Sequence, residues 1–165
     1  MSEGANITET KLRAALGDDI VAVSHSRGEL TVTVPAARIV DVCTRLRDDE
    51  DLAYDLLSDL CAADYPEREK RFDINYHAYS LSKGHSVRIK IRVGEGEPVP
   101  TVTGVWPGAN WYEREAYDML GVEFEGHPDL RRILMWDEFE GHPLRKDFPL
   151  TTEPIPFRHG RPMET

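Results

Sequence analysis

Hydrophobic and polar residues alternate most regularly in the middle of the chain. Between Phe72 and Tyr79 every second residue is apolar or aromatic, and between Val87 and Val93 basic residues separate the aliphatic ones. A period of two is typical of a β-strand with one buried face, and the intervening Ser82–Gly84 is typical of a turn. The pattern therefore predicts a β-hairpin with two strands of matched length.

The N-terminal part of the chain predicts a second hairpin and two helices. The runs Ile20–His25 and Leu30–Val34 are typical of strands joined by a tight turn at Arg27–Gly28. Between Ile39 and Leu46 apolar residues recur with the i, i+3, i+4, i+7 spacing of an amphipathic helix. A shorter helix is expected over Glu9–Leu16, where two leucines are four positions apart.

Three further stretches complete the pattern. Leu52–Ala63 fits a helical stripe and a short buried strand equally well, so both alternatives stay open. Gly94–Pro100 has the composition of a loop and is expected to end the compact part of the chain. A helix then follows, with Asn110 as its N-cap, Glu113 in the capping-box position and Gly121 at its C-terminal end.

The predicted elements define an α+β fold with a mainly antiparallel sheet flanked by helices and an extended, irregular C-terminal segment. We expect a compact α+β domain over residues 1–106, a helix over 107–121, and an extended partner-binding segment over 122–165. Prolines interrupt the sequence after Gly121, and Thr151–Thr165 has too few apolar residues to pack by itself.

Composition excludes several classes of function. The formal net charge of −10 argues against an autonomous nucleic-acid-binding protein and against electrostatic attachment to anionic lipid. The polar N-terminus, Ser2–Thr10, does not have the pattern of a signal peptide, and no apolar run is long enough to span a bilayer. We therefore expect a soluble protein that faces the cytosol.

The two cysteines, Cys43 and Cys61, limit the possible cofactors. An iron–sulfur cluster usually requires four closely spaced thiolates, so the chain alone is not expected to hold one. No histidine spacing completes a structural zinc site. We interpret both cysteines as small buried residues in a reducing compartment.

Two Gly-His-Pro turns carry the candidate chemistry. His127 and His142 precede Pro128 and Pro143 in an irregular stretch of the chain. The nearby carboxylates allow a metal or acid–base site, but the adjacent basic pairs would repel a divalent cation. Structural or interface use of the histidines is therefore the preferred interpretation. The carboxylates are Glu113, Glu115 and Asp118, and the basic pairs are Arg131-Arg132 and Arg145-Lys146.

The same region combines aromatic and charged residues. Trp106, Trp111 and Trp136 suit interface anchors and core packing about equally. The basic pairs are nearly cancelled by acids such as Asp147, which makes a nucleic-acid-binding face improbable. Ion pairs within the chain or between subunits explain this pattern better, because guanidinium groups bind carboxylates bidentately.

These motifs resemble the 30 kDa subunit family of respiratory complex I, whose bacterial members are designated by the letter C. The resemblance covers about the last two-thirds of the chain. Its motifs are Trp106–Trp111, Glu113-Arg114-Glu115, Asp118-Met119-Leu120, His127, Arg131–Leu134 and Gly141–Leu150, with weaker likeness at Asp64–Pro66, Arg71-Phe72 and Tyr76–Val93. The basic pair of the family motif is usually Lys-Arg, and Arg131-Arg132 preserves its charge.

The resemblance implies a subunit without cofactor or catalytic residues of its own, in a proton-pumping NADH:quinone oxidoreductase whose FMN, iron–sulfur clusters, NADH and quinone are bound by other subunits. Its partners would be the quinone-site subunit and the iron–sulfur subunits. The complex would sit at the cytoplasmic face of the inner (plasma) membrane, or on the matrix side in a mitochondrion. This chain would be peripheral and would contact the membrane only through the complex.

The resemblance also implies that the stretch Trp111–Leu150 binds the neighbouring subunit. The expected interface residues are Trp111, Glu113, Arg114, Glu115, Asp118, His127, Pro128, Arg131, Arg132, His142, Pro143, Arg145, Lys146 and Asp147. On this view Arg145→Glu would weaken assembly with little effect on the melting temperature of the isolated chain. Two alternatives stay open: the equivalent subunit of a membrane-bound hydrogenase or ferredoxin-dependent complex, and an autonomous metal-dependent enzyme that uses His127 and His142.

Overall fold

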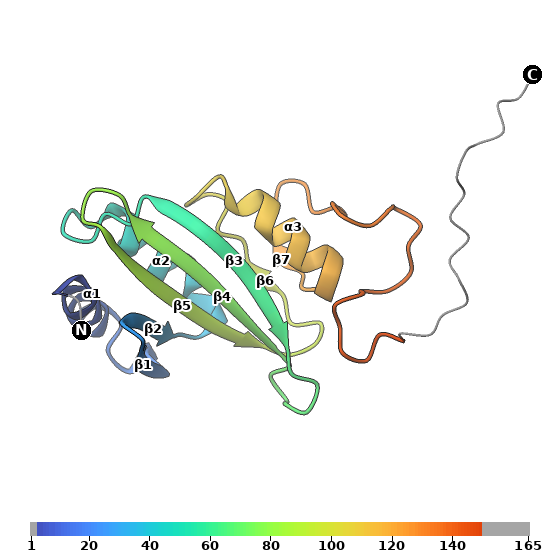
Figure 1. Ribbon diagram of the computed structural model, residues 1–165, viewed down its shortest axis with the longest axis horizontal. Coiled ribbons are helices and arrows are strands. Elements are labelled where there is room, and N and C mark those ends of the chain that lie inside the picture. Colours follow the sequence, from blue (N-terminus) through green and yellow to red (C-terminus); the bar gives the residue numbers. More distant parts are fainter. Residues whose placement is uncertain (1–2, 150–165) are drawn as a thin grey trace, which may run out of the picture.

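The computed structural model describes residues 3–149 and has the predicted α+β architecture (Figure 1). The expectations for the tail Thr151–Thr165 lie outside the described residues. In chain order the elements are α1 (Glu3–Leu16), the 3-10 turn η1 (Gly17–Asp19), β1 (Ala22–Ser26), β2 (Glu29–Thr33), the 3-10 turn η2 (Ala36–Arg38), α2 (Ile39–Asp48), β3 (Leu56–Asp64), β4 (Phe72–Ser80), β5 (His85–Val93), β6 (Val99–Pro100), α3 (Ala109–Leu120) and β7 (Phe124–Glu125).

Five strands form one sheet in the order β1-β2-β5-β4-β3. Both predicted hairpins are confirmed: β1 pairs antiparallel with β2, and β4 with β5 from Phe72 opposite Val93 to Ser80 opposite His85. The pairing of β2 with β5 is parallel, so the sheet is mixed but mostly antiparallel. The chain returns from β2 to β5 through α2, β3 and β4.

Most of the stretch Leu52–Ala63, which the sequence left open, is a strand, β3, that begins at Leu56. It pairs antiparallel with β4, from Leu56 opposite Tyr79 to Asp64 opposite Phe72. A register shift between Leu57 and Asp59 breaks its alternation. This β-bulge explains why the leucines of β3 imitate a helical stripe, because one additional residue disrupts the period of two.

The core lies between one face of the sheet and the helices. Along β4, Ile74, Tyr76 and Ala78 are buried, whereas Asn75 and His77 on the opposite face are half-buried. Figure 1 shows the three long strands in front of α2, with α3 beside β3. The other members of this core come from every part of the described fold, and include Leu12, Leu30, Val42, Leu46, Ile89, Trp106, Ala116 and Phe124.

Three local expectations are corrected. The helix α3 begins at Ala109 after an N-cap at Gly108, so Asn110 lies within the helix and does not cap it. Glu113 is fully buried and forms no capping box, because its carboxylate binds the chain near Val102. Cys61 is exposed, and only Cys43 is a buried thiol as predicted.

The short strands β6 and β7 connect regions that sequence reasoning separated. They pair in parallel, with Val99 opposite Phe124 and Pro100 opposite Glu125. The loop expected over residues 94–100 therefore ends in a strand. The division into residues 1–106, 107–121 and 122–165 stays a prediction.

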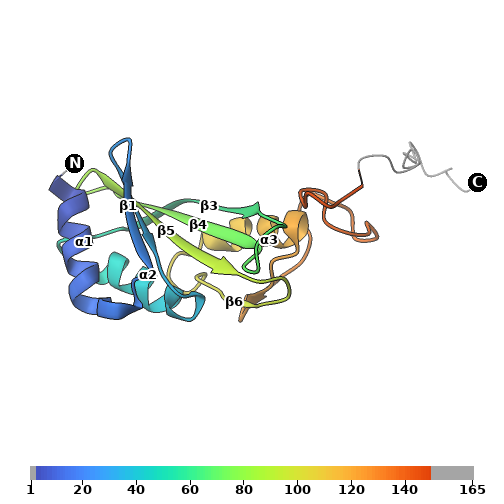
Figure 2. The same cartoon turned by 90° about the horizontal axis from the view of Figure 1, so that it is seen from below.

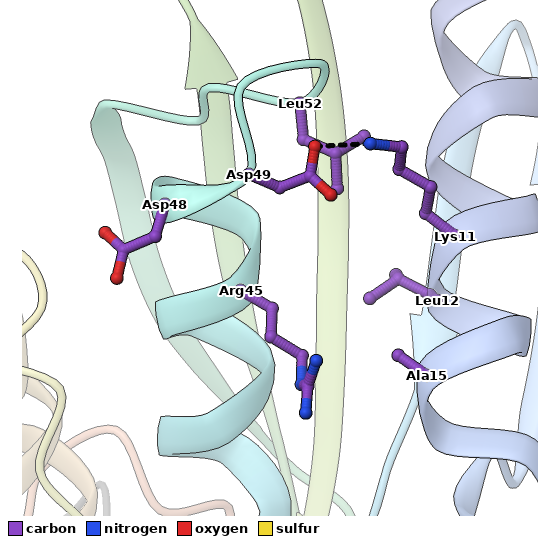
Figure 3. A pocket seen from close by; sticks show the side chains of 7 residues that line it. All are labelled: Lys11, Leu12, Ala15, Arg45, Asp48, Asp49 and Leu52. Carbon is purple, nitrogen blue, oxygen red and sulfur yellow. Dashed lines mark hydrogen bonds and ion pairs between the residues drawn. The ribbon is translucent and has the colours of Figure 1, made fainter.

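A pocket of about 270 Å³ separates α1 from α2 (Figure 3). Leu12, Ala15 and Leu52 provide its apolar lining, and an ion pair between Lys11 and Asp49 joins its two sides. Figures 1 and 2 place α1 at the opposite end of the molecule from the last described residues, drawn in red. The pocket is therefore remote from the candidate site. No helix within residues 3–149 has both the length and the apolar character that crossing a bilayer requires.

Candidate partner-binding surface

The candidate site consists of α3 and residues 122–149, which we call the C-terminal segment. Helix α3 directs Ala116, Met119 and Leu120 into the core and ends at Gly121, which adopts a left-handed conformation with φ of 74°. A Cβ atom at this glycine would lie 2.6 Å from side-chain atoms of Arg145 and His142. Glycine is therefore required both by the backbone angle and by the close approach of the C-terminal segment.

Asp118 fixes the first part of the C-terminal segment. Its side chain is completely buried, and one carboxylate oxygen accepts hydrogen bonds from the backbone N–H groups of Ile133, Leu134 and Met135 at 3.0, 2.8 and 2.8 Å. The other oxygen accepts from Arg132 at 2.6 Å. Burial alone would raise the pKa of Asp118, but these four donors outweigh it and lower the pKa.

Arg114 complements Asp118 from one turn earlier on α3. Its Nε and Nη2 groups donate to the backbone carbonyls of Arg131 and Arg132 at 3.2 and 3.1 Å. The cationic side chain thus binds carbonyl groups, and the anionic one binds the N–H groups that follow. Two charged residues with i, i+4 spacing hold five consecutive residues, 131–135, against the helix.

The second part of the C-terminal segment binds the C-terminal end of α3. His142 Nδ1 donates to the carbonyl of Asp118 at 2.9 Å, and Arg145 Nε donates to the carbonyl of Leu120 at 2.7 Å. The backbone N–H of Leu144 donates to the carbonyl of Met119 at 3.0 Å. The last carbonyls of a helix lack partners within the helix, and a cation there is also favoured by the helix dipole.

Sequence reasoning gave no role to the buried ion pair between Asp64 and Arg71. The Arg71 guanidinium binds both oxygens of Asp64 at 2.7 and 3.0 Å and also contacts Asp147 at 2.9 Å. Asp64 accepts the backbone N–H of Lys146 at 2.8 Å. Arg71 lowers the pKa of the Asp64 carboxyl. The only signal in the sequence was their place in the motifs Asp64–Pro66 and Arg71-Phe72.

The predicted interface residues differ in their accessibility. The structure buries Glu113, Arg114 and Asp118 and leaves Arg132, His127, His142, Pro143 and Arg145 half-buried. It exposes Trp111, Glu115, Pro128, Arg131, Lys146 and Asp147. The first group does not form an outer surface, whereas the half-buried residues expose only part of their side chains and can border an interface.

His127 and His142 hold the backbone at opposite ends of α3. His127 Nε2 donates to the carbonyl of Asn110 at 3.3 Å, and its Nδ1 accepts the N–H of Asp129 at 3.0 Å. His127 Nε2 also lies 3.9 Å from the Glu113 carboxylate, whose pKa burial raises to about 7. The positions of both histidines fit the structural use that was preferred from the sequence.

Four large apolar side chains remain exposed on α3 and the C-terminal segment. Trp111, Leu134 and Leu144 are each 61% exposed, and Trp136 is 46% exposed. Trp136 packs edge-on against Phe139, with 4.9 Å between the ring centroids. We call these four residues the apolar surface. Trp106, by contrast, is a core residue whose indole N–H donates to the carbonyl of Tyr54.

The fold and this site define an α+β protein that fixes its C-terminal segment on its own helix and presents large apolar side chains outward. Contiguous exposed apolar patches mark protein–protein contacts, and tryptophan is enriched among the residues that anchor them. Comparison with known proteins identifies the family. Residues 32–154 match the family described as "Respiratory-chain NADH dehydrogenase, 30 Kd subunit".

Individual relatives agree with this match. The NADH-quinone oxidoreductase subunit designated "C 1" of Rhizobium meliloti (strain 1021) is 51% identical over 151 residues, which cover 92% of this chain and 75% of the relative. The corresponding subunit of Caulobacter vibrioides (strain ATCC 19089 / CIP 103742 / CB 15) is 54% identical over 143 residues, covering 82% and 73%. The chain therefore belongs to the family of the 30 kDa subunit of NADH-quinone oxidoreductase, which confirms the resemblance seen in its motifs.

A solved structure shares the fold. A chain from the membrane-bound sulfane sulfur reductase, described as an archaeal respiratory membrane complex, superimposes with a TM-score of 0.76 at 26% sequence identity. The match covers 90% of this chain and 87% of that chain. Membership of the family makes this chain a subunit of a hetero-oligomeric enzyme.

Proposed function

We propose that this chain is a cofactor-free structural subunit in the peripheral arm of a proton-pumping NADH:quinone oxidoreductase. It docks on the quinone-site subunit through the apolar surface and thereby supports electron transfer from NADH to quinone. FMN, the iron–sulfur clusters, NADH and quinone are bound by other subunits. The chain lies at the cytoplasmic face of the inner (plasma) membrane, or on the matrix side in a mitochondrion, and contacts the membrane only through the complex.

The observation that carries this proposal is the rigid presentation of the apolar surface. Leu134 is held outward because its own backbone N–H donates to the buried carboxylate of Asp118. Leu144 is held outward because its N–H donates to Met119 at the end of α3. A backbone fixed in this way does not have to be ordered on binding, which lowers the entropy cost of forming an interface.

The polar residues of the site support a structural role over a catalytic one. Arg132 is bound to Asp118, His142 to the helix carbonyl of Asp118, and Arg145 to that of Leu120. Their donors are thus engaged in holding the backbone. A catalytic acid or base would instead have to reach a substrate with its titrating atom.

The test replaces exposed apolar groups without altering the hydrogen bonds beneath them. The double variant Leu134→Ser/Trp136→Ser should reduce incorporation into the purified complex and leave the melting temperature of the isolated chain nearly unchanged. Leu81→Ser is the matched control, because Leu81 is 65% exposed in the turn after β4, away from the site. Normal incorporation of the double variant would contradict the proposal.

The likeness to the archaeal complex favours one second candidate, the equivalent subunit of a related membrane-bound hydrogenase or ferredoxin-dependent complex. The two candidates share the docking role but differ in their electron donor. Co-purification of an NADH-binding subunit supports the first candidate. Recovery of a complex that contains a hydrogenase or ferredoxin-binding subunit in its place supports the second.

A further inference from the structure

We propose that Asp59, Cys61 and His77 form a binding site for one divalent zinc ion at the β3 edge of the sheet. One carboxylate oxygen, the thiol sulfur and one imidazole nitrogen lie within 4.8 Å of one another. The site is separate from the C-terminal segment and goes beyond the docking role proposed above.

The backbone of two paired strands brings the three side chains together. Asp59 and Cys61 are two residues apart on β3 and therefore point to the same face of the sheet. His77 on β4 lies directly opposite Asp59 in the antiparallel register. The register shift between Leu57 and Asp59 sets which residues of β3 share this face. Because the strands are hydrogen-bonded, the three positions are fixed before any ion binds.

The donor set favours zinc over hard cations. A thiolate and an imidazole are typical ligands of zinc, whereas magnesium and calcium prefer oxygen ligands alone. Zinc bonds of about 2.0 Å to nitrogen or oxygen and about 2.3 Å to sulfur place tetrahedral ligands roughly 3.3–3.7 Å apart. The three ligand atoms therefore need to move by only about an ångström, through side-chain rotations, to surround an ion.

The surroundings leave room for a fourth ligand. A pocket of about 160 Å³ between β3 and α3 is lined by Asp59, Cys61, Tyr112 and Glu115. The Tyr112 hydroxyl donates to the carbonyl of Ser58 at 3.1 Å and so ties α3 to the bulged part of β3. Water in this pocket would complete a tetrahedral site beside α3.

Zinc binds cysteine as the thiolate, so an ion that enters this site would displace a proton from Cys61.

Arg88 competes with the metal and gives the proposal an additional test. Its Nε donates to His77 Nε2 at 3.3 Å, while its Nη2 donates to Glu29 at 2.8 Å. Glu29 can retain the guanidinium after His77 turns to the ion. Replacing Arg88 with leucine removes both the competing donor and a repelling positive charge, so zinc should bind more tightly to this variant.

The experiment uses the purified, reduced full-length chain titrated with Co²⁺ in an absorption spectrometer and with Zn²⁺ in a calorimeter. We expect one ion per chain and a near-ultraviolet sulfur-to-cobalt charge-transfer band. Cys61→Ser should abolish the band. His77→Asn should weaken binding by at least about tenfold, because even residues that only hydrogen-bond to a metal ligand usually contribute that much to affinity. Cys43→Ala and His25→Asn are the matched controls and should bind like the parent, because Cys43 is buried elsewhere and His25 pairs with Glu9.

Two results would overturn the proposal. The first is the absence of stoichiometric binding to the parent chain with Cys61 shown to be reduced by thiol titration. The second is binding that persists unchanged in both Cys61→Ser and His77→Asn, which would assign the ion to other surface carboxylates. The melting temperature of each variant, measured without metal, confirms that loss of binding does not result from unfolding.

Discussion

Asp118 and Arg132 form an ion pair of 2.6 Å in which the carboxylate is completely buried. The other oxygen of the same carboxylate binds three successive backbone N–H groups, those of residues 133–135. One side chain of α3 thus determines the path of an irregular segment that has no secondary structure to hold it. The orientation of Leu134 and Trp136 is a consequence of this arrangement.

Asp118→Ala should therefore destabilise the isolated chain by about 3–5 kcal/mol, the cost typical of leaving a partner of a buried ion pair without compensation. The buried N–H groups would lose their acceptor as well. Unfolding in urea, followed by tryptophan fluorescence, measures this loss. Asp129→Ala is the control: Asp129 pairs with Arg131 in an exposed position, so its removal should change stability by no more than ~0.5 kcal/mol. Equal effects of the two variants would contradict the role given to Asp118.

Arg145→Glu should now lower the stability of the isolated chain, which differs from the expectation based on the sequence. Arg145 donates to the carbonyl of Leu120 and pairs with Glu95 at 2.6 Å, so it holds the C-terminal segment on its own domain. Loss of hydrogen bonds from a charged donor should cost about 2 kcal/mol. Thermal unfolding measures the effect. The control variant Lys146→Glu, at the next position, should lose much less stability, because the Lys146 side chain is exposed.

The ion pair between Asp64 and Arg71 should behave as a coupled unit. Arg71→Met leaves a buried carboxylate without its guanidinium and should cost about 3–5 kcal/mol. The double variant Asp64→Asn/Arg71→Met should be less destabilised than the sum of its single variants. A double-mutant cycle in urea tests this, and Lys70→Met, which breaks the exposed pair with Glu97, serves as the control. Additive effects would show that the two side chains do not interact.

The regular elements were predictable from the sequence because each has one buried face. The strands β4 and β5 and the helix α2 follow simple periods, and their residues are buried as those periods require. The bulge after Leu57 concealed β3, since it breaks the period of two. The strands β6 and β7 have two residues each, too few to produce any pattern.

Motifs in the sequence indicated part of the candidate site but not its geometry, and the predicted interface residues did not include Leu134, Trp136 or Leu144. Motif resemblance selected Arg114, Asp118 and Arg132, and the structure places all three in one network. Glu113 was misread because a glutamate three residues after asparagine imitates a capping box. Spacing along the sequence also does not reveal that Arg71 reaches Asp147, because that contact depends on how the C-terminal segment folds back.

Glu113 should make stability depend on pH in a characteristic direction. Burial raises its pKa from 4.5 to about 7, so the folded state favours the neutral carboxyl. The contribution of Glu113 to the free energy of unfolding is fully present below about pH 4.5 and is lost as the pH rises through about 7. The neutral replacement Glu113→Gln should gain up to ~3 kcal/mol relative to the parent chain above pH 7 and little near pH 4.5.

Urea unfolding of the parent chain and of Glu113→Gln between about pH 5 and about pH 8.5 measures the difference in their free energies of unfolding. Contributions from other titrating groups cancel in this difference. Glu115→Gln is the control, because Glu115 is exposed on the same helix. A constant difference between Glu113→Gln and the parent chain across this range would contradict a raised pKa at Glu113.

Docking through the apolar surface is the central claim, and site-specific photocrosslinking in native membranes tests it most directly. A photoreactive phenylalanine derivative is introduced at Trp136 and, in a separate chain, at the exposed control position Leu81. After irradiation, mass spectrometry identifies the subunit attached to each chain. We predict an adduct with the quinone-site subunit from position 136 and none from position 81. An adduct with that subunit from position 81 and none from position 136 would contradict the account.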